Sequence, residues 1–184
     1  MANGDTTVAR LWLWVRKARA TDWDARFAEE LPRVYNFFRY RVGAGPVAED
    51  LTGITFEKAW GARDRYREDR AGFETWLFAV ARNVAMDHFR RSKASVPLED
   101  VADLPDGPTP EEIAERRSDE RRLGALLAQR SERERELLAF KYGAEFTNRE
   151  IAGLTGLSES NVGTILHRAV EALRADWDKE SEDG

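Results

Sequence analysis

The polar residues that could contact DNA lie on one side of a helix predicted near the carboxyl terminus. The stretch LSESNVGTILHRAVEALR covers residues 157–174, and its basic residues are Arg168 and Arg174. The outward positions of such a helix are Ser160, Asn161, Thr164, His167 and Arg168. An asparagine amide can pair with adenine, hydroxyls can contact bases or phosphates, and arginine can bind guanine or phosphate. The pattern predicts a lightly charged helix that reads DNA.

A helix in a DNA groove must be held by a second helix across a tight turn. Ala152 is small where the two helices would cross, and Gly156 permits the positive φ of a sharp turn. Val162 would fix the second helix onto the first, and Ser158 can cap it. Further apolar contacts are expected from Ile151, Leu157 and Ile165. The spacing predicts a helix-turn-helix, with an ordinary helical hairpin as the alternative.

Residues 22–94, called here the first block, have helical periodicity and no alternation typical of strands. Three helices are predicted, in FAEELPRVYNFFRYRV, VAEDLTGITFEKAW and FETWLFAVARNVAMDHFRR, with a charged loop over 61–72. Along one side of the second helix fall Val47, Leu51, Ile54, Thr55 and Lys58, and Phe56 and Trp60 widen this apolar stripe. The third helix should bury a band made of Phe73, Trp76, Leu77, Val80, Ala81, Val84 and His88. Its polar residues fall largely outside that band: Arg82, Asn83, Arg90 and Arg91.

The net charge of −5 is concentrated in two stretches. Residues 95–118 form an acidic, proline-rich linker, and 178–184 an acidic tail. A helix should begin near Pro110, which suits a first helical turn. Ser131 and Glu134 fit a capping box inside the second block, defined as residues 119–177. Residues 1–21 are an extension whose positions 8–19 could form an amphipathic helix. The chain is therefore expected to be all-α, with two small helical domains.

Several classes of protein are excluded by composition. The chain has no cysteine and two histidines, so disulfides, thiolate chemistry and histidine-rich metal centres are not expected. No glycine-rich phosphate loop or pairing of a nucleophile with a base is evident, so an enzyme is not predicted. No secretory signal or segment of about 20 apolar residues occurs, which predicts a cytoplasmic protein without stable membrane insertion.

The order of motifs resembles a known family. AEDLTGITFEKAW, then FETWLFAVARNVAMDHFRR, an acidic linker, and RERELLAFKYGAEFTNREIAGLTGLSESNVGTILHRAVEALR resemble bacterial sigma factors of the extracytoplasmic-function (ECF) group, in the sigma-70 superfamily. The resemblance covers roughly residues 24–94 and 122–175. It implies sigma region 2-like and region 4-like domains that recruit core RNA polymerase to promoters, with no cofactor. An anti-sigma factor is a further partner that the resemblance allows.

The resemblance also assigns roles to residues. The helix over 47–60 would dock on the polymerase clamp coiled coil through Asp50, Leu51, Phe56 and Trp60. The minus-10 element would be recognised and melted by Arg63, Tyr66, Arg67, Arg70, Arg82, Asn83, Arg90 and Arg91. The minus-35 element would be read by Arg149, Ser160, Asn161, Thr164, His167 and Arg168. Cations suit phosphates, and aromatic groups suit bases held outside the stack.

The chain departs from the family pattern in both blocks. Gly53 and Ile54 stand where Gln-Glu is common, and Gly163, Ile165 and Val170 replace familiar cations. Each lost phosphate contact makes the slope of log binding constant against log salt concentration less steep by about 0.9. A factor delivered by polymerase tolerates weak DNA binding by the second block. Once polymerase holds the DNA, the second block meets its site at a high effective concentration. A helix-turn-helix regulator of the response-regulator effector type, acting without polymerase, is the alternative function.

Overall fold

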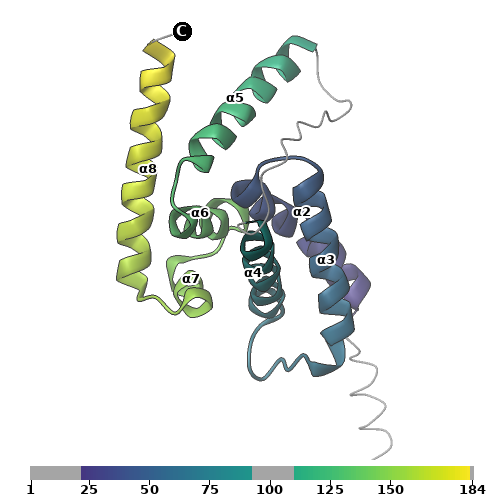
Figure 1. Ribbon diagram of the computed structural model, residues 1–184. Coiled ribbons are helices and arrows are strands. Elements are labelled where there is room, and N and C mark those ends of the chain that lie inside the picture. Colours follow the sequence, from purple (N-terminus) through teal and green to yellow (C-terminus); the bar gives the residue numbers. More distant parts are fainter. Residues whose placement is uncertain (1–21, 93–109, 183–184) are drawn as a thin grey trace, which may run out of the picture. The chain divides into compact units, whose positions relative to one another are not determined.

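The computed structural model describes residues 22–92 and 110–182, and their regular elements are all helices (Figure 1). The predicted all-α class is confirmed. The predicted amphipathic helix at 8–19 and the early part of the linker lie outside the described residues.

The first block contains three long helices and one short turn. They are α2 (Trp23–Val42), α3 (Pro46–Ala62), the 3-10 turn η1 (Arg63–Arg65) and α4 (Phe73–Ser92). Gly43 and Gly45 connect α2 to α3 with φ of 88° and 123°, values that favour glycine. Pro46 then occupies the first turn of α3, where its missing N–H costs no helical hydrogen bond.

The side of α3 that packs inward differs from the prediction. Small residues, Ala48, Thr52 and Ala59, are buried together with Leu51 and Thr55. The Thr52 and Thr55 hydroxyls donate to the carbonyls of Ala48 and Leu51, so these buried groups are satisfied within the helix. Small side chains permit a close approach of helices, and α3 packs on α4.

Val47 and Ile54, which were placed with Leu51 on the apolar stripe of α3, are 44% and 39% exposed. That part of the prediction is wrong, because it followed side-chain size and hydrophobicity and not the fit against α4. In α4 the expected band is largely confirmed, with Phe73, Leu77, Ala81 and Val84 buried. Phe78 is fully buried as well, although the pattern did not select it.

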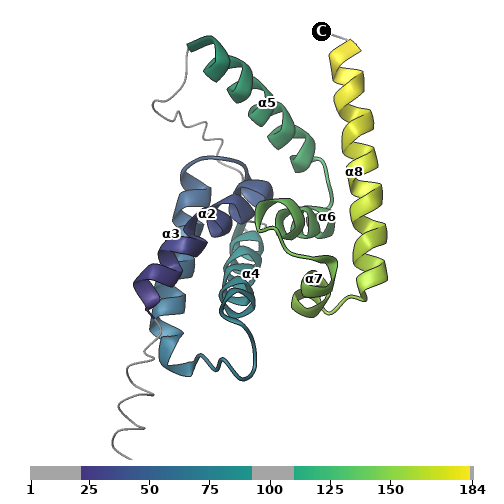
Figure 2. The same cartoon turned by 180° about the vertical axis from the view of Figure 1, so that it is seen from behind.

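The remaining helices are α5 (Pro110–Ala128), α6 (Glu132–Leu138), the π-helical turn η2 (Ala139–Gly143), α7 (Asn148–Thr155) and α8 (Glu159–Glu182) (Figure 2). The predicted start at Pro110 and the predicted capping box of Ser131 and Glu134 are both confirmed. Arg122 lies over the Trp177 ring at 4.1 Å and joins α5 to the last turns of α8. Helix α8 continues through Glu182, beyond the residue where the tail was expected to begin.

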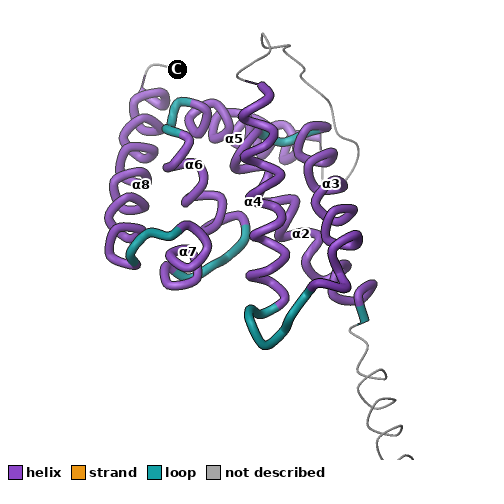
Figure 3. Tube along the Cα trace, turned by 60° about the horizontal axis from the view of Figure 1, so that its bottom comes forward, coloured by secondary structure: helices purple, strands orange, loops and turns teal. Residues whose placement is uncertain are grey.

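The chain divides into two units inside α2, and residues 31–184 form the larger one. Within this unit α4 packs on both α3 and α7 (Figure 3). Ring centroids are 4.8 Å apart for Phe37 and Phe140, and 4.9 Å apart for Phe78 and Phe146. The first and second blocks therefore share an aromatic core.

Candidate nucleic-acid interface

The helix-turn-helix is built by local capping and by two apolar anchors. Thr147 and Glu150 form a reciprocal capping box at the start of α7, and these hydrogen bonds lower the pKa of the Glu150 carboxyl. Gly156 ends α7 with φ of 74°, and the Ser158 hydroxyl accepts from the Asn161 N–H at 3.2 Å. The turn and the cap agree with the sequence prediction.

The anchors of the motif are fully buried. Ile151 and Val162 are both 0% exposed, so α7 and α8 are fixed against each other. The capping box of α7 was not predicted, although the spacing of Thr147 and Glu150 is its sequence signature.

The side of α8 expected to face DNA is exposed. It carries Ser160, Asn161, Thr164, His167 and Arg168, and Arg149 of α7 is exposed as well. The Thr164 hydroxyl donates to the Ser160 carbonyl at 3.0 Å, which leaves its oxygen able to accept from a base or from water. These groups can make directional hydrogen bonds, but they supply little positive charge for phosphates.

All three positions that lack familiar cations are half-buried. Gly163, Ile165 and Val170 therefore contribute to packing of α8 as well as to its surface. Arg174 is 72% exposed and pairs with Glu171 at 3.1 Å, which reduces the net charge of this part of the helix. The low charge read from the sequence therefore holds in three dimensions.

Aromatic side chains cluster at the start of α4. The Tyr66 ring lies 5.1 Å from Trp76 and 6.0 Å from Phe73, measured between centroids. Arg63 lies 4.3 Å from the Trp60 ring and donates to the Trp60 carbonyl at 2.8 Å. Tyr66, Trp76 and Arg63 are half-buried.

Most other residues of the predicted minus-10 set are exposed: Arg67, Arg70, Asn83, Arg90 and Arg91. Arg90 donates to Asp87 at 2.9 Å, and Lys58 of α3 lies 3.6 Å from the same carboxylate. Exposed ion pairs of this kind are weak and easily exchanged for a phosphate. Exposed cations therefore lie in the loop, at Arg67 and Arg70, and at the carboxyl end of α4, at Arg90 and Arg91.

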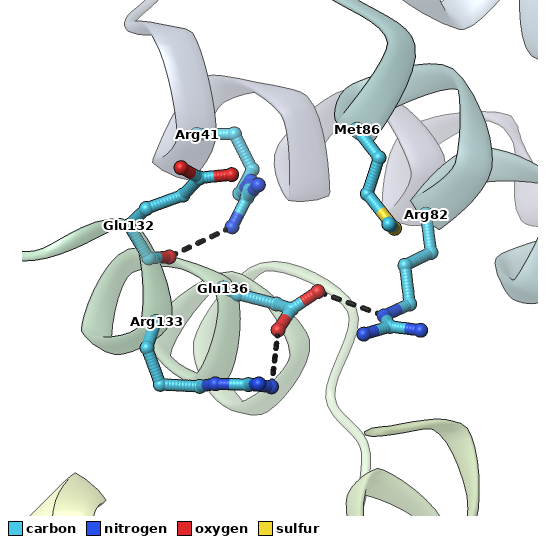
Figure 4. Close-up of a pocket in the computed structure, with 6 residues that line it drawn as sticks. All are labelled: Arg41, Arg82, Met86, Glu132, Arg133 and Glu136. Carbon is cyan, nitrogen blue, oxygen red and sulfur yellow. Dashed lines mark hydrogen bonds and ion pairs between the residues drawn. The ribbon is translucent and has the colours of Figure 1, made fainter. Parts of the chain in front are cut away.

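Arg82 is placed differently from the rest of this set. Its Nε donates to Oε1 of Glu136 in α6 at 2.8 Å, and its side chain is 24% exposed (Figure 4). The other carboxylate oxygen of Glu136 accepts from Arg133 at 2.9 Å. Glu136 has a side chain that is only 8% exposed. Arg82 was expected on the outer side of α4, and in the structure it contacts the second block.

A pocket of about 280 Å³ surrounds this ion pair. It is lined by Arg41, Arg82, Met86, Glu132, Arg133 and Glu136 (Figure 4). Arg41 is 3% exposed and donates to the Glu132 carbonyl at 3.0 Å. Burial lowers the pKa of the Arg41 guanidinium to about 10, with Glu136 and Glu132 acting in the opposite direction.

Neither Arg41 nor Glu136 was selected from the sequence. Arg41 makes its hydrogen bond to a residue 91 positions away, and Glu136 pairs with a residue 54 positions away. No local pattern signals such a contact. These two residues are therefore a finding of the tertiary structure.

The predicted docking residues on α3 separate into two kinds. Asp50 is exposed and Trp60 is 46% exposed, whereas Phe56 is half-buried. Leu51 is 5% exposed and belongs to the core, so its side chain is not available to a partner in this structure.

Within the described ranges, no three histidine, aspartate or glutamate side chains are grouped so that they could hold a metal ion. The helices described here include none with both the length and the apolar character needed to cross a membrane.

Comparison with known proteins identifies both blocks. The family model of Sigma-70 region 2 matches residues 27–95, and that of Sigma-70, region 4, matches residues 120–173. The RNA polymerase sigma factor CarQ of Myxococcus xanthus is 32% identical over 151 residues, which are 80% of this chain and 84% of CarQ. The ECF RNA polymerase sigma factor RpoE of Cereibacter sphaeroides is 27% identical over 175 residues, 86% of this chain and 96% of that protein.

Solved structures have the same fold. The sigma factor RpoE of Bartonella quintana, in complex with the anti-sigma factor NepR, superposes with a TM-score of 0.67 at 22% identity. The alignment covers 85% of this chain and 96% of that one. CnrH, in complex with the cytosolic domain of CnrY, gives a TM-score of 0.58 at 24% identity and covers 84% of each chain.

Proposed function

The chain belongs to the ECF group of the sigma-70 family, and on this premise we propose a division of labour among its surfaces. It is a transcription initiation factor that binds core RNA polymerase and directs it to promoters. The observation that carries this function is the match of region 2 and region 4 in one chain, in that order. A regulator acting without polymerase would leave the region 2 match unexplained.

The first block is proposed to bind the minus-10 element. The exposed cations Arg67, Arg70, Arg90 and Arg91, with Asn83, would contact phosphates and base edges, and Arg63 and Tyr66 would support an extruded base. Support comes from the exposure of Arg67, Arg70, Asn83, Arg90 and Arg91 and from the position of Tyr66 beside Trp76. Arg82 would join this set only after it leaves Glu136.

The second block is proposed to read the minus-35 element through the exposed side of α8, together with Arg149. Its low charge suits hydrogen-bonded reading more than strong phosphate binding. This block would set the position of the protein on the DNA and add a modest preference for the DNA sequence, while the first block and polymerase would supply most of the affinity for the promoter. The reason is that each absent phosphate contact lowers the affinity of the second block for DNA.

Docking on polymerase is proposed for the exposed part of α3, around Asp50, Phe56 and Trp60. Leu51 would contribute indirectly, because its buried side chain packs α3 onto the core. An anti-sigma factor is proposed as a second partner, by analogy with RpoE of Bartonella quintana, whose solved structure contains the anti-sigma factor NepR. The chain would work in the cytoplasm, where polymerase transcribes, and no catalytic step of its own is proposed.

The test is transcription in vitro with purified protein and core RNA polymerase on genomic fragments. We expect transcripts from discrete start sites that core polymerase alone does not use. The variants Arg67→Gln and Arg70→Gln should reduce open-complex formation, and Arg121→Gln, an exposed arginine outside these surfaces, serves as the control. Absence of start sites that depend on the protein would refute the function.

A further inference from the structure

Three arginines from three different helices line the pocket around Glu136: Arg41 of α2, Arg82 of α4 and Arg133 of α6 (Figure 4). The carboxylates of the same lining belong to Glu132 and Glu136. Arginine is protonated at neutral pH, so the lining carries three positive and two negative charges. This surplus of positive charge favours an anion as ligand over a metal ion.

Arg41 is a buried cation without a matching anion. It is 3% exposed and donates to the Glu132 carbonyl, and among the described residues no carboxylate forms an ion pair with it. Its Nε atom is buried and has no hydrogen-bond partner in that part of the chain. The Phe89 ring, 4.7 Å away, offsets the charge only in part. Buried charges are normally paired, and a buried donor without a partner indicates a water or an ion bound beside it.

Arg82 and Arg133 are both oriented by Glu136. Arg82 donates through Nε to one carboxylate oxygen at 2.8 Å, and Arg133 donates through Nη1 to the other at 2.9 Å. Each guanidinium has five N–H donors, so both retain donors after this contact. Their side chains are 24% and 46% exposed, so a ligand that enters from solvent can reach them. Donors that are held in place before binding lower the entropy cost of binding.

The donor set and the size of the pocket define the ligand. The planar fork of a guanidinium matches pairs of phosphate oxygens, which accept two parallel hydrogen bonds from it. The volume of about 280 Å³ is below the roughly 300–1,000 Å³ of pockets that enclose drug-sized molecules. The pocket therefore suits a phosphate group, and a nucleoside attached to that group would remain outside.

We propose that this pocket is a binding site for a phosphate group, either as free phosphate or as the terminal phosphate of a nucleotide. The phosphate accepts hydrogen bonds from Arg41 and from the remaining donors of Arg82 and Arg133, and it supplies the negative charge that Arg41 lacks. Water can accept a hydrogen bond from Arg41, but it carries no net charge. The proposal goes beyond promoter recognition and does not depend on the proposed function.

The test is isothermal titration calorimetry of the full-length chain with inorganic phosphate and, separately, with GTP, in a phosphate-free buffer at constant ionic strength. We expect one saturable site in the wild type. Arg133→Gln should raise the Kd for phosphate about tenfold or more, because a charge-assisted hydrogen bond is lost. Arg121→Gln is the matched control, since Arg121 is an exposed arginine outside the pocket, and its Kd should equal that of the wild type.

Glu136→Gln is the second variant and should act in the opposite direction. It removes one negative charge from the lining and keeps the side-chain shape, so the Kd for phosphate should fall severalfold. Thermal unfolding of each variant, with and without phosphate, shows that the protein is folded. It also gives the rise in Tm that a ligand of the folded state must cause. A merely structural role for Arg133 and Glu136 would not change the phosphate affinity in opposite directions.

Folded wild-type protein that binds neither phosphate nor GTP would overturn the proposal. Binding that is equal in the wild type, Arg133→Gln and Glu136→Gln would overturn it as well, because the ligand would then lie elsewhere. Binding of phosphate and GTP with similar affinity supports the site and assigns free phosphate to it, whereas binding of GTP alone assigns a nucleotide. Failure of the proposed function appears separately, as absence of transcription by wild-type protein with core polymerase.

Discussion

The ion pair of Arg82 and Glu136 should contribute measurably to folding, unlike the exposed ion pairs of this chain. The perturbation is a double-mutant cycle with Arg82→Gln and Glu136→Gln. Two unit charges about 4 Å apart attract by about 4 kcal/mol at an effective dielectric constant of about 20, and by about 1 kcal/mol in water. With side chains 24% and 8% exposed, the pair lies between these limits.

Loss of hydration offsets part of this attraction, because Glu136 is almost fully removed from water. We therefore expect a coupling energy of about 1–2 kcal/mol. The control cycle uses Arg174→Gln and Glu171→Gln, whose side chains are 72% and 55% exposed. An exposed pair spaced i,i+3 should give about 0.3–0.5 kcal/mol.

The assay is urea denaturation followed by circular dichroism, with the free energy of unfolding extrapolated to water for all four proteins of each cycle. A coupling energy for Arg82 and Glu136 no larger than that of the control pair would refute this reasoning. It would mean that α4 and α6 are not held together in solution as the structure shows.

Three further predictions concern the helix-turn-helix. Thr147→Ala should lower the free energy of unfolding by about 1 kcal/mol at pH 7, as measured by urea denaturation. Because hydrogen bonds to Thr147 lower the folded-state pKa of Glu150, this stabilisation is present above the ordinary pKa of 4.5 and is lost as the pH falls through the lower folded value, so the penalty should shrink in acid. Gly156→Ala should destabilise by about 1 kcal/mol through its φ of 74° alone, since a Cβ there meets no atom within 4 Å; an unchanged melting temperature would contradict this. Arg168→Gln should weaken promoter binding by the polymerase complex and reduce the slope of log K against log salt by about 0.9; an unchanged slope would show that Arg168 does not contact phosphate.

The helices and the helix-turn-helix can be predicted from the sequence, because their signals are local. Pro110 marks the start of α5, Ser131 caps α6, and Gly156 provides the positive φ after α7. Each of these features depends on residues within one or two helical turns, so its physical cause can be read from neighbouring positions.

Local patterns were insufficient where packing between helices decides. On α3, Ala48, Thr52 and Ala59 are buried and Ile54 is 39% exposed, so the side that packs inward is not the most hydrophobic one. A pattern that weighs hydrophobicity selects the larger residue.

The partner of Arg82 is set by packing between distant helices. The sequence placed Arg82 among outward cations, and periodicity cannot show that Glu136, far along the chain, lies opposite it. Gly143 lies so close to Asn36 that an added Cβ would be 2.8 Å from the Asn36 carbonyl oxygen. No sequence pattern indicates this contact. The reason is physical: such contacts depend on the relative position of packed helices, which is set by the whole core.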